Sequence, residues 1–263
     1  DTVYTFANKK VYRSTDFGNN WNALTMTDFV NSGKVIRNLA GSRRSNAVAL
    51  ASSGGQFWVS TNNGTTWTTS GDVTAGSSYT SYVWFNTEND QILYGATVAP
   101  NANAHHLFRS SNGGTNWTPI DGSSAASNGL PFGIPIHVVQ NLPGSLNTLF
   151  VGTDFGVYRS TDGGDTWTRF GEGLPLVGVR DLYLAPDGSF IRIATFGRGV
   201  WEAALTATGA PLDANGDGKV DPYDLLELLK RYGSTDAADL AKADFNGDSA
   251  INDADLTLLL AAL

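Results

Sequence analysis

Ser160-Thr-Asp-Gly-Gly-Asp-Thr-Trp167 is the clearest of four related stretches that decide the fold of the larger part of this chain. The other three are Ser14-Thr-Asp-Phe-Gly-Asn-Asn-Trp21, Ser60-Thr-Asn-Asn-Gly-Thr-Thr-Trp67 and Ser110-Ser-Asn-Gly-Gly-Thr-Asn-Trp117. The leading serines lie 46, 50 and 50 residues apart, so the stretches mark an internal repeat. Each stretch joins two short strand-like runs and is therefore predicted to form a hairpin turn.

The residue types of the stretch suit a tight turn. The third position is Asp in the first and fourth copies and Asn in the others, and both can accept hydrogen bonds from backbone N–H groups of the turn. Glycine at the fifth position can adopt the positive φ that other residues avoid. The closing tryptophan should pack the turn onto its sheet. We therefore expect largely buried scaffold residues at Trp21, Trp67, Trp117 and Trp167.

Two further strand-like runs precede the turn, for example residues 136–140 and 148–152. Four strands in about 50 residues is the pattern of a β-propeller blade. The first copy begins at residues 3–6 without an innermost strand, and the last ends at residues 199–202 without an outer strand. We therefore expect sheets of about three, four, four, four and three strands. They would form either part of a larger propeller or about five blades in a closed ring.

The two ends of this repeat would leave sheet edges open. Strands at residues 3–6 and 199–203 would each have one unpaired edge, and such an edge readily pairs with another strand. We therefore expect these backbones to pair with each other, with another chain or with upstream residues.

The repeated stretches resemble the Asp-box motif, also called the bacterial neuraminidase repeat, with the pattern Ser-x-Asp-x-Gly-x-x-Trp. The family with this motif includes sialidases, xyloglucan-degrading glycoside hydrolases and sortilin-type receptors. The resemblance covers about residues 1–205 and implies a mainly β fold, a β-propeller. Residues 193–201 are similar to the sequence motif found in the last blade of such propellers, where the ring closes. Asn62 and Asn112 replace the Asp of the motif and keep its hydrogen-bond acceptor.

Charge is distributed unevenly along the 263 residues. The formal net charge is −8, and residues 213–263 carry −7 of it because they hold ten Asp and one Glu. The chain has no basic stripe, so a nucleic-acid partner is not expected. No apolar run approaches the roughly 20 residues of a membrane span. A segment this rich in Asp should either stay unfolded or hold cations.

Two twelve-residue stretches in the acidic segment have the ligand spacing of an EF-hand calcium loop. Oxygen-bearing side chains stand at positions 1, 3, 5, 9 and 12, and position 7 would contribute its backbone carbonyl. In the first loop the predicted ligands are Asp213, Asn215, Asp217, Lys219, Asp221 and Asp224. In the second loop they are Asp244, Asn246, Asp248, Ala250, Asn252 and Asp255. Both loops lead into leucine-rich helical patterns, so we expect two calcium ions in a small α-helical module.

The two loops differ in ways that should matter for calcium binding. Position 6, where the loop turns sharply, is Gly218 in the first loop and Ser249 in the second. The first loop offers four carboxylates and the second three, so the first should bind calcium more tightly. Val220 and Ile251 at position 8 should face each other between the loops. A module of about fifty residues with few apolar residues should not fold without metal.

Tandem loop–helix units with Asp at position 12 resemble the dockerin family, over about residues 212–263. Dockerins attach enzymes to scaffolds by binding cohesin modules, so the resemblance implies a cohesin-like partner, or docking onto the propeller itself. The family's contact residues at positions 10 and 11 are here Pro222-Tyr223 and Asp253-Ala254. Neither pair matches the Ser-Thr dyad of cellulosomal dockerins. Because the two pairs also differ from each other, symmetric binding in two modes is not expected.

No set of catalytic residues emerges from the sequence. The Phe-Arg-Ile-Pro signature of sialidases is present only as Phe-Gly-Ile-Pro at residues 132–135, without its Arg. A glycosidase needs two carboxylates across a cleft, and no Asp or Glu pair of the propeller part stands out. His105 and His106 are expected in a solvated loop, because adjacent strand residues would point to opposite faces. His137 is expected in the core or at the rim, and Trp84 in packing between blades rather than on a sugar.

The sequence therefore predicts a β-propeller over residues 1–205, a linker over 206–212 and a calcium-binding module over 213–263. The favoured function is binding and assembly by a secreted or cell-surface protein. In this interpretation the propeller is a recognition or scaffold domain, and the calcium-binding module attaches the propeller to a partner. One alternative is the C-terminal part of a polysaccharide-degrading glycoside hydrolase that resembles the xyloglucanases. Another is an extracellular fibre or surface-layer subunit that self-associates through the open propeller edges. Whether the chain is an enzyme stays open. The favoured interpretation is that this chain does not catalyse a reaction.

Overall fold

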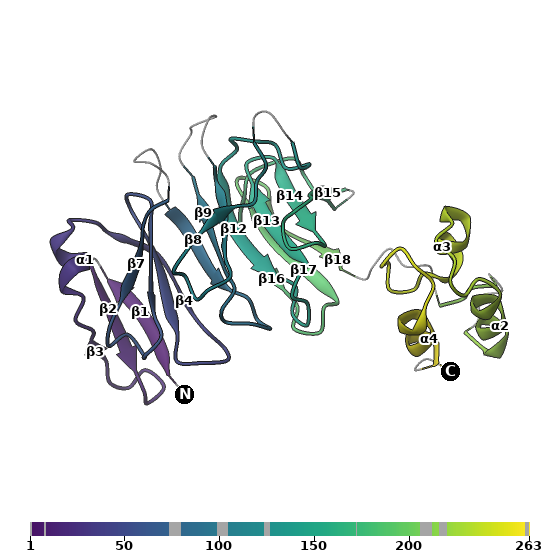
Figure 1. Cartoon of the computed structure of the whole chain (residues 1–263), viewed down its shortest axis with the longest axis horizontal. Coiled ribbons are helices and arrows are strands. Elements are labelled where there is room, and N and C mark those ends of the chain that lie inside the picture. Colours follow the sequence, from purple (N-terminus) through teal and green to yellow (C-terminus); the bar gives the residue numbers. More distant parts are fainter. Residues whose placement is uncertain are drawn as a thin grey trace. The chain divides into compact units, whose positions relative to one another are not determined.

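The structure is a computed structural model of the chain (Figure 1). It describes residues 2–7, 9–73, 80–98, 105–123, 127–171, 173–205, 212–215, 220–260 and 263, and only the backbone of residues 27 and 28. The chain divides into two compact units, Asp1–Ala203 and Ala204–Leu263. Most of the predicted linker, residues 206–211, lies outside the described residues.

The first unit consists, in its described residues, of five sheets that follow one another in chain order (Figure 1). The first sheet contains β1 (Val3–Ala7), β2 (Lys10–Ser14) and β3 (Asn22–Ala23), and a short helix, α1 (Thr27–Asn31), follows it. The second contains β4 (Ile36–Gly41), β5 (Val48–Ser52), β6 (Gln56–Ser60) and β7 (Thr68–Asp72). The third contains β8 (Thr80–Phe85), β9 (Leu93–Thr97), β10 (Leu107–Ser110) and β11 (Thr118–Pro119). The fourth contains β12 (Ile136–Asn141), β13 (Leu149–Thr153), β14 (Gly156–Ser160) and β15 (Thr168–Phe170). The last contains β16 (Val179–Leu184), β17 (Phe190–Thr195) and β18 (Gly199–Ala204).

The pairing register of the strands follows the sequence repeat. In the first four sheets the leading Ser of each turn lies opposite the first residue of the preceding strand, in the pairs Val3–Ser14, Val48–Ser60, Leu93–Ser110 and Leu149–Ser160. Strands β4, β8, β12 and β16 share a register shift, a β-bulge, between their first and third residues. These four strands also lie beside one another in chain order. The sheets are therefore copies of one blade, with these four strands innermost.

The core of the first unit lies between successive sheets. Strands β5, β9 and β13, the second strands of the central sheets, are buried at every residue. One apolar cluster around Phe29 joins the first and second sheets, another around Phe57 joins the second and third, and another around Tyr94 joins the third and fourth. Buried apolar surface contributes about 25 cal/mol per Å². A blade is therefore stabilised mainly where a neighbouring blade covers it.

The four repeated turns form the same hydrogen-bonded loop. In the fourth copy the hydroxyl oxygen of Ser160 accepts from the N–H of Gly164 at 2.8 Å, and the hydroxyl donates to Asp162 Oδ1 at 2.7 Å. The N–H of Thr166 donates to the same Oδ1 at 2.9 Å. The same bonds recur in the other copies, where the accepting residues are Asp16, Asn62 and Asn112. Asn forms these three bonds as Asp does, as the sequence predicts.

The tryptophans that close these turns differ in burial. Trp167 is 3% exposed, Trp67 and Trp117 are half-buried, and Trp21 is 41% exposed. The covered tryptophans pack against the preceding sheet, as Trp117 does by stacking on Phe57 with 4.3 Å between ring centroids. No sheet precedes the first one among the described residues. The prediction of burial is therefore wrong at Trp21, because the surface that would cover it belongs to a neighbouring blade.

Both terminal sheets have three strands, as the repeat predicts. β1 is an edge of the first sheet and β18 is an edge of the last. The two edges do not pair with each other among the described residues, so that part of our expectation is wrong for this chain alone. Pairing with another chain or with upstream residues stays a prediction. The fold is mainly β and consists of propeller blades, as expected.

The second unit contains, in its described residues, three helices, α2 (Pro222–Lys230), α3 (Ala237–Ala243) and α4 (Asp253–Leu260), and α2 contacts both of the others. α2 begins with a capping box, in which the side chain of Asp221 accepts a hydrogen bond from the backbone N–H of Asp224, and the side chain of Asp224 accepts one from the backbone N–H of Asp221. A proline stands in its first turn. The sequence did not predict α3. The small core of the unit consists of Ala214, Leu228, Ala243, Phe245, Ile251 and Leu259.

Candidate metal centre

Three carboxylates converge in the second acidic loop. Asp244, Asp248 and Asp255 each offer an oxygen atom that lies within 4.8 Å of the other two. Asp255 is fully buried, Asp244 is buried and Asp248 is exposed. Like charges this close repel one another unless a cation neutralises them. The cluster therefore has the electrostatics of a cation site.

Backbone N–H groups fix the orientation of Asp244. Its Oδ1 accepts from Gly247 at 2.7 Å and from Asp248 at 3.1 Å, and its Oδ2 accepts from Ser249 at 3.0 Å. Ser249 has a φ of 70°, in the left-handed region that favours glycine. The loop therefore makes the sharp turn expected at position 6, at a conformational cost that glycine would not have.

The carboxylate at position 12 has the same place in both loops. Asp255 accepts the N–H groups of positions 3 and 9 of its loop, at 3.0 and 2.9 Å. Asp224 accepts the same two N–H groups in the first loop, at 3.1 and 2.8 Å. Both side chains are fully buried. The two loops therefore share one architecture, and position 12 ties the ends of each loop together.

The other predicted ligands of the second loop surround Asp248. The side-chain amides of Asn246 and Asn252 donate to Asp248 Oδ2 at 2.9 and 3.1 Å. The carbonyl of Ala250 accepts from the Asn252 amide at 3.4 Å. The structure thus brings all six predicted residues of this loop together, and their role as ligands stays a prediction.

The first loop is described in part. Asp217 and Lys219 lie outside the described residues, together with Gly218. The described ligand candidates are Asp213, Asn215, Asp221 and Asp224. Tyr223 at the start of α2 donates its N–H to Asp221 Oδ1 at 2.8 Å, so the loop passes directly into the helix.

The donor set of these loops fits calcium. Every predicted ligand offers an oxygen atom, from a carboxylate, an amide or a backbone carbonyl, and Ca²⁺ takes six to eight such ligands in flexible geometry. Neither predicted loop contains the thiolate or imidazole ligands that select zinc or copper. The residues would hold a hard divalent cation and neutralise it.

Position 8 does not join the two loops as expected. Ile251 is fully buried in the core of the unit, and its backbone exchanges hydrogen bonds with Gly233 and Ser234. Val220 is exposed. The expectation that Val220 and Ile251 face each other is wrong, because the segment after α2 pairs with the second loop instead.

α2 and α4 differ in the side chains that they expose. Tyr223 is 69% and Leu226 is 51% exposed on α2, and Leu229 one turn further is exposed as well. At the equivalent positions of the first two, α4 has Ala254 and Thr257, which are also exposed. At these two positions α2 therefore presents large side chains and α4 small ones, while both helices expose a leucine at the third position, Leu229 and Leu260.

The sheets contain a polar cluster that the sequence analysis missed. His137 on β12, Asp154 in the turn after β13 and Arg180 on β16 lie together. His137 Nε2 is 2.8 Å from Asp154 Oδ1, and Arg180 Nη1 is 2.6 Å from Nε2 and 2.9 Å from Nδ1 of the same ring. Burial lowers the pKa of His137, although the hydrogen bond to Asp154 opposes this shift. Phe155 and Phe196, both exposed, flank the cluster.

The other histidines are not in a solvated loop. His106 is fully buried, with its ring 2.8 Å from the hydroxyl of Thr97. His105 Nδ1 lies 2.6 Å from Asp121, which is itself buried. The expectation of a solvated loop is therefore wrong. The structure supports the interpretation of Trp84 as a packing residue, since it is half-buried and its Nε1 donates to Asn141 at 3.1 Å.

Comparisons with known families agree with the two units. Residues 1–169 match the model of the DUF6242 beta propeller domain, and residues 211–263 match the model of the dockerin type I domain. The first match covers more than half of the chain. The chain belongs to the DUF6242 beta propeller family. Its C-terminal part is a dockerin type I domain, a type of domain that binds calcium.

The propeller is similar to enzymes that are much longer. A xyloglucanase of Hypocrea jecorina (strain QM6a) is 26% identical over 238 residues, which are 84% of this chain and 27% of that protein. A GH74 enzyme of Niastella koreensis superposes with a TM-score of 0.57 at 21% identity, over 77% of this chain and 34% of the enzyme. The chain thus spans about a quarter to a third of the length of these relatives.

A third similar structure has a different description. YCF48 bound to D1 peptide superposes with a TM-score of 0.56 at 18% identity, over 78% of this chain and 61% of YCF48. At this level of identity the likeness shows the fold of the propeller. Among the described residues, no helix is long and apolar enough to cross a membrane.

Proposed function

We propose that this chain is an extracellular assembly component whose dockerin domain, loaded with calcium, attaches the propeller to a cohesin-type partner. The observation that carries the proposal is the large apolar face of α2 beside the first calcium loop. The match to the dockerin type I domain supports a cohesin-type partner and an extracellular setting. The similarity to a xyloglucanase supports a propeller that interacts with a β-glucan.

Calcium would hold the dockerin domain in its folded form through two ions, one in each loop. In the first loop the ligands would be Asp213, Asn215, Asp217, Lys219, Asp221 and Asp224, and in the second Asp244, Asn246, Asp248, Ala250, Asn252 and Asp255. The first ion would bind more tightly because its loop offers one more carboxylate and has Gly218 at the sharp turn. Each ion would neutralise carboxylates that otherwise repel one another, as in the cluster around Asp244.

The partner would dock on α2 in one orientation. Exposed aromatic and aliphatic side chains on a rigid helix are typical of the residues that dominate binding energy in protein interfaces. On α2 these residues are Tyr223, Leu226 and Leu229, and ion pairs of Glu227 with Lys230 and Arg231 lie on the same helix. α4 has the smaller Ala254 and Thr257 at the positions of Tyr223 and Leu226, while its Leu260, equivalent to Leu229, is exposed as well.

Binding of the full chain to a panel of type I cohesin domains in millimolar calcium tests this proposal by surface plasmon resonance. We expect Leu226→Ala and Tyr223→Ala each to weaken binding at least about tenfold, as interface anchors do. The matched control is Thr257→Ala, which occupies the position of Leu226 in the other helix and should change binding less than about twofold. Excess chelator should abolish binding by the wild-type chain.

Two results would contradict the docking proposal. One is binding that falls equally with Leu226→Ala and Thr257→Ala, which would point to both helices. The other is an absence of binding to every cohesin tested when circular dichroism shows that the calcium-loaded domain is folded.

A β-glucan would bind beside Asp154, and the exposed aromatic rings there favour this second role. Sugar rings stack on exposed aromatic faces while carboxylate, imidazole and guanidinium groups bind their hydroxyls. We expect Phe155→Ala and Phe196→Ala to lower the affinity of the chain for xyloglucan oligosaccharides in calorimetric titration. Phe17→Ala is the control, because Phe17 is also exposed but lies in the turn of the first sheet. Unchanged affinity in both test variants would exclude this site.

A further inference from the structure

A cavity of about 320 Å³ lies between the first and second sheets, and we call it the α1 cavity. Its apolar and aromatic walls are Met26, Phe29, Trp58 and Trp67. Met26 and Phe29 belong to the segment that leads from β3 through α1, and the two tryptophans belong to β6 and to the turn that follows it. Small-molecule sites occupy roughly 300–1,000 Å³. The size of the α1 cavity therefore suits one small molecule.

The equivalent place between the third and fourth sheets is covered by the chain itself. There Trp167 is 3% exposed and shares an apolar cluster with the fully buried Leu130. The N–H of Trp167 donates to the carbonyl of Asn128 at 2.7 Å. Trp67, at the same position of the second turn, is half-buried, and no described residue accepts its backbone N–H. The α1 cavity therefore lies where the fourth turn has an apolar cover and a hydrogen-bond acceptor.

A buried donor without a partner lines the same cavity. Trp58 is 7% exposed, and its buried Nε1 has no hydrogen-bond partner among the described residues. Its ring makes an edge contact with Phe29, with 5.5 Å between the ring centroids. Most buried N–H groups have a partner, because an unpaired one is costly. The Trp58 N–H is therefore a reason to expect a ligand with an acceptor atom.

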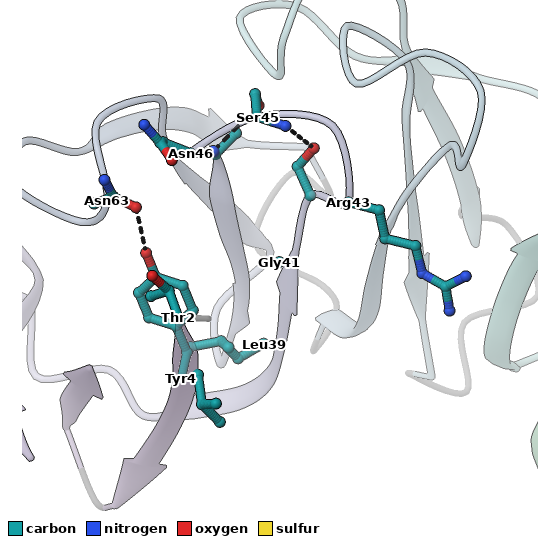
Figure 2. Close-up of a pocket in the computed structure, with 11 residues that line it drawn as sticks. Thr2, Tyr4, Leu39, Gly41, Arg43, Ser45, Asn46 and Asn63 are labelled. Atoms are coloured by element: carbon teal, nitrogen blue, oxygen red, sulfur yellow. Dashed lines mark hydrogen bonds between the residues drawn. The ribbon is translucent and has the colours of Figure 1, made fainter. Parts of the chain in front are cut away.

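Figure 2 shows another pocket between the same two sheets, and its chemistry differs. There the hydroxyl of Tyr4 donates to Asn63 Oδ1 at 3.0 Å, and no described side chain that lines it has a buried polar atom without a partner. Arg43 also lines that pocket and adds a charge. The described side chains that line the α1 cavity carry no charge. The α1 cavity is therefore suited to a neutral ligand.

Hydroxyl groups complete the lining. Thr25, Thr65 and Thr66 are exposed at the cavity. The hydroxyl of Thr66 accepts from the side-chain amide of Asn62 at 2.9 Å, so its own hydrogen is available to a ligand. A purely apolar ligand would leave the Trp58 N–H unpaired, and a charged ligand would find no opposite charge in the described lining. A neutral sugar has both surfaces, because its C–H face packs on aromatic rings and its hydroxyls form hydrogen bonds.

We propose that the α1 cavity binds one neutral pyranose sugar unit. The sugar ring would pack against Trp67 and Met26, and its hydroxyl oxygens would accept from the Trp58 indole and the backbone N–H of Trp67. The cavity lies on other sheets than the proposed glucan site beside Asp154. This inference therefore depends on neither the proposed glucan binding nor the proposed cohesin binding.

NMR titration of the isotope-labelled full chain with D-glucose tests the proposal, with the indole N–H signals as the readout. The Trp58 signal is assigned by its loss in Trp58→Phe, a variant that has the ring of Phe108 at the equivalent position of the third sheet. We expect glucose to shift the Trp58 signal saturably, with a dissociation constant in the millimolar range. Glycerol, which has hydroxyls but no ring, should leave the signal unchanged. Sugar binding beside Asp154 would not move it.

Two matched substitutions in the repeated turns provide the control. Thr65→Phe places a ring in the α1 cavity and should weaken glucose binding at least about tenfold. Thr115→Phe makes the same change at the equivalent, equally exposed position of the third turn, and Thr115 does not line the cavity. It should leave glucose binding unchanged. Thr25→Phe blocks the cavity from the side of α1 and replaces Thr65→Phe if melting shows that this variant does not fold.

Three results would overturn the proposal. One is a Trp58 signal that neither glucose, galactose nor xylose shifts at concentrations up to about 100 mM. Another is a shift by glycerol equal to that by glucose, which would show a general solvent effect. The third is an equal loss of affinity in the blocking variant and in Thr115→Phe.

Discussion

Aspartate is stabilised in opposite ways in the propeller and in the dockerin domain. In the fourth turn of the propeller, Asp162 accepts hydrogen bonds from the N–H and hydroxyl groups of Thr166 at 2.9 and 2.6 Å, and from Ser160 at 2.7 Å. Neutral donors therefore stabilise its charge. In the second loop of the dockerin domain, Asp244, Asp248 and Asp255 have oxygen atoms within 4.8 Å of one another, and backbone donors do not cancel three charges.

The difference shows what each unit requires. The propeller turn uses Asp as an acceptor, so Asn62 and Asn112 accept the same backbone N–H and serine hydroxyl bonds in the second and third copies. The calcium loop uses Asp as a charge, which Asn cannot replace. The propeller is stabilised by apolar layers between blades, and in our proposal the dockerin domain is stabilised by its cations.

The largest effect should come from the apolar layer around Trp167. Trp167→Ala should lower the free energy of unfolding of the propeller by about 3–5 kcal/mol, because the side chain is buried against the preceding sheet. Trp21→Ala, at the equivalent but exposed position, should cost less than about 1 kcal/mol. Denaturant titration followed by circular dichroism measures both values. Equal costs would show that the turn, and not the neighbouring sheet, sets the contribution of the tryptophan.

Removing the position-12 carboxylate should weaken calcium binding at least about tenfold in either loop. Asp224→Ala should have the larger effect, because Asp224 also forms the capping box of α2. Asp162→Ala serves as the control, since a propeller turn should not affect calcium affinity. Isothermal titration calorimetry of the full-length variants gives the affinities. Equal affinities of the Asp224→Ala and Asp255→Ala variants would contradict the ranking of the loops.

Replacing Asp by Asn separates an acceptor from a charge. Asp162→Asn should change the stability of the propeller by no more than about 1 kcal/mol, because the amide oxygen can accept the same N–H bond. Asp248→Asn should leave the propeller unchanged and reduce calcium affinity. Thermal melting with and without calcium distinguishes the two variants. A propeller that melts at a far lower temperature in the Asp162→Asn variant would mean that its turn needs the charge.

The smallest effect should be that of acid on the propeller turns. The N–H and amide of Asn20, with the hydroxyl of Ser14, lower the pKa of Asp16 to about 2. Burial works against ionisation of Asp162, but its N–H and hydroxyl donors outweigh it and again lower the pKa to about 2. These values lie below the ordinary 3.8, so the stabilisation is present above about pH 4 and is lost as the pH falls toward 2. The melting temperature of the double variant Asp16→Asn and Asp162→Asn should fall less over this range.

The sequence predicts those features that depend on local chemistry. The turns, the strand numbers of the five sheets and the two loop–helix units could be read because each depends on residues a few positions apart. The exposure of Trp21 could not, since burial of this residue depends on a neighbouring sheet. The cluster of His137, Asp154 and Arg180 could not either, because its residues come from elements 17 and 43 positions apart and carry no motif.

The dependence of the dockerin domain on calcium is tested most directly by amide hydrogen exchange of the full chain with calcium and with excess chelator. We predict that chelation removes the protection of α2 and α4 and leaves the protection of β5, β9 and β13 unchanged, because the sheets do not depend on a cation. Protection of α2 and α4 that persists in excess chelator would contradict the central claim that calcium holds this domain in its folded form.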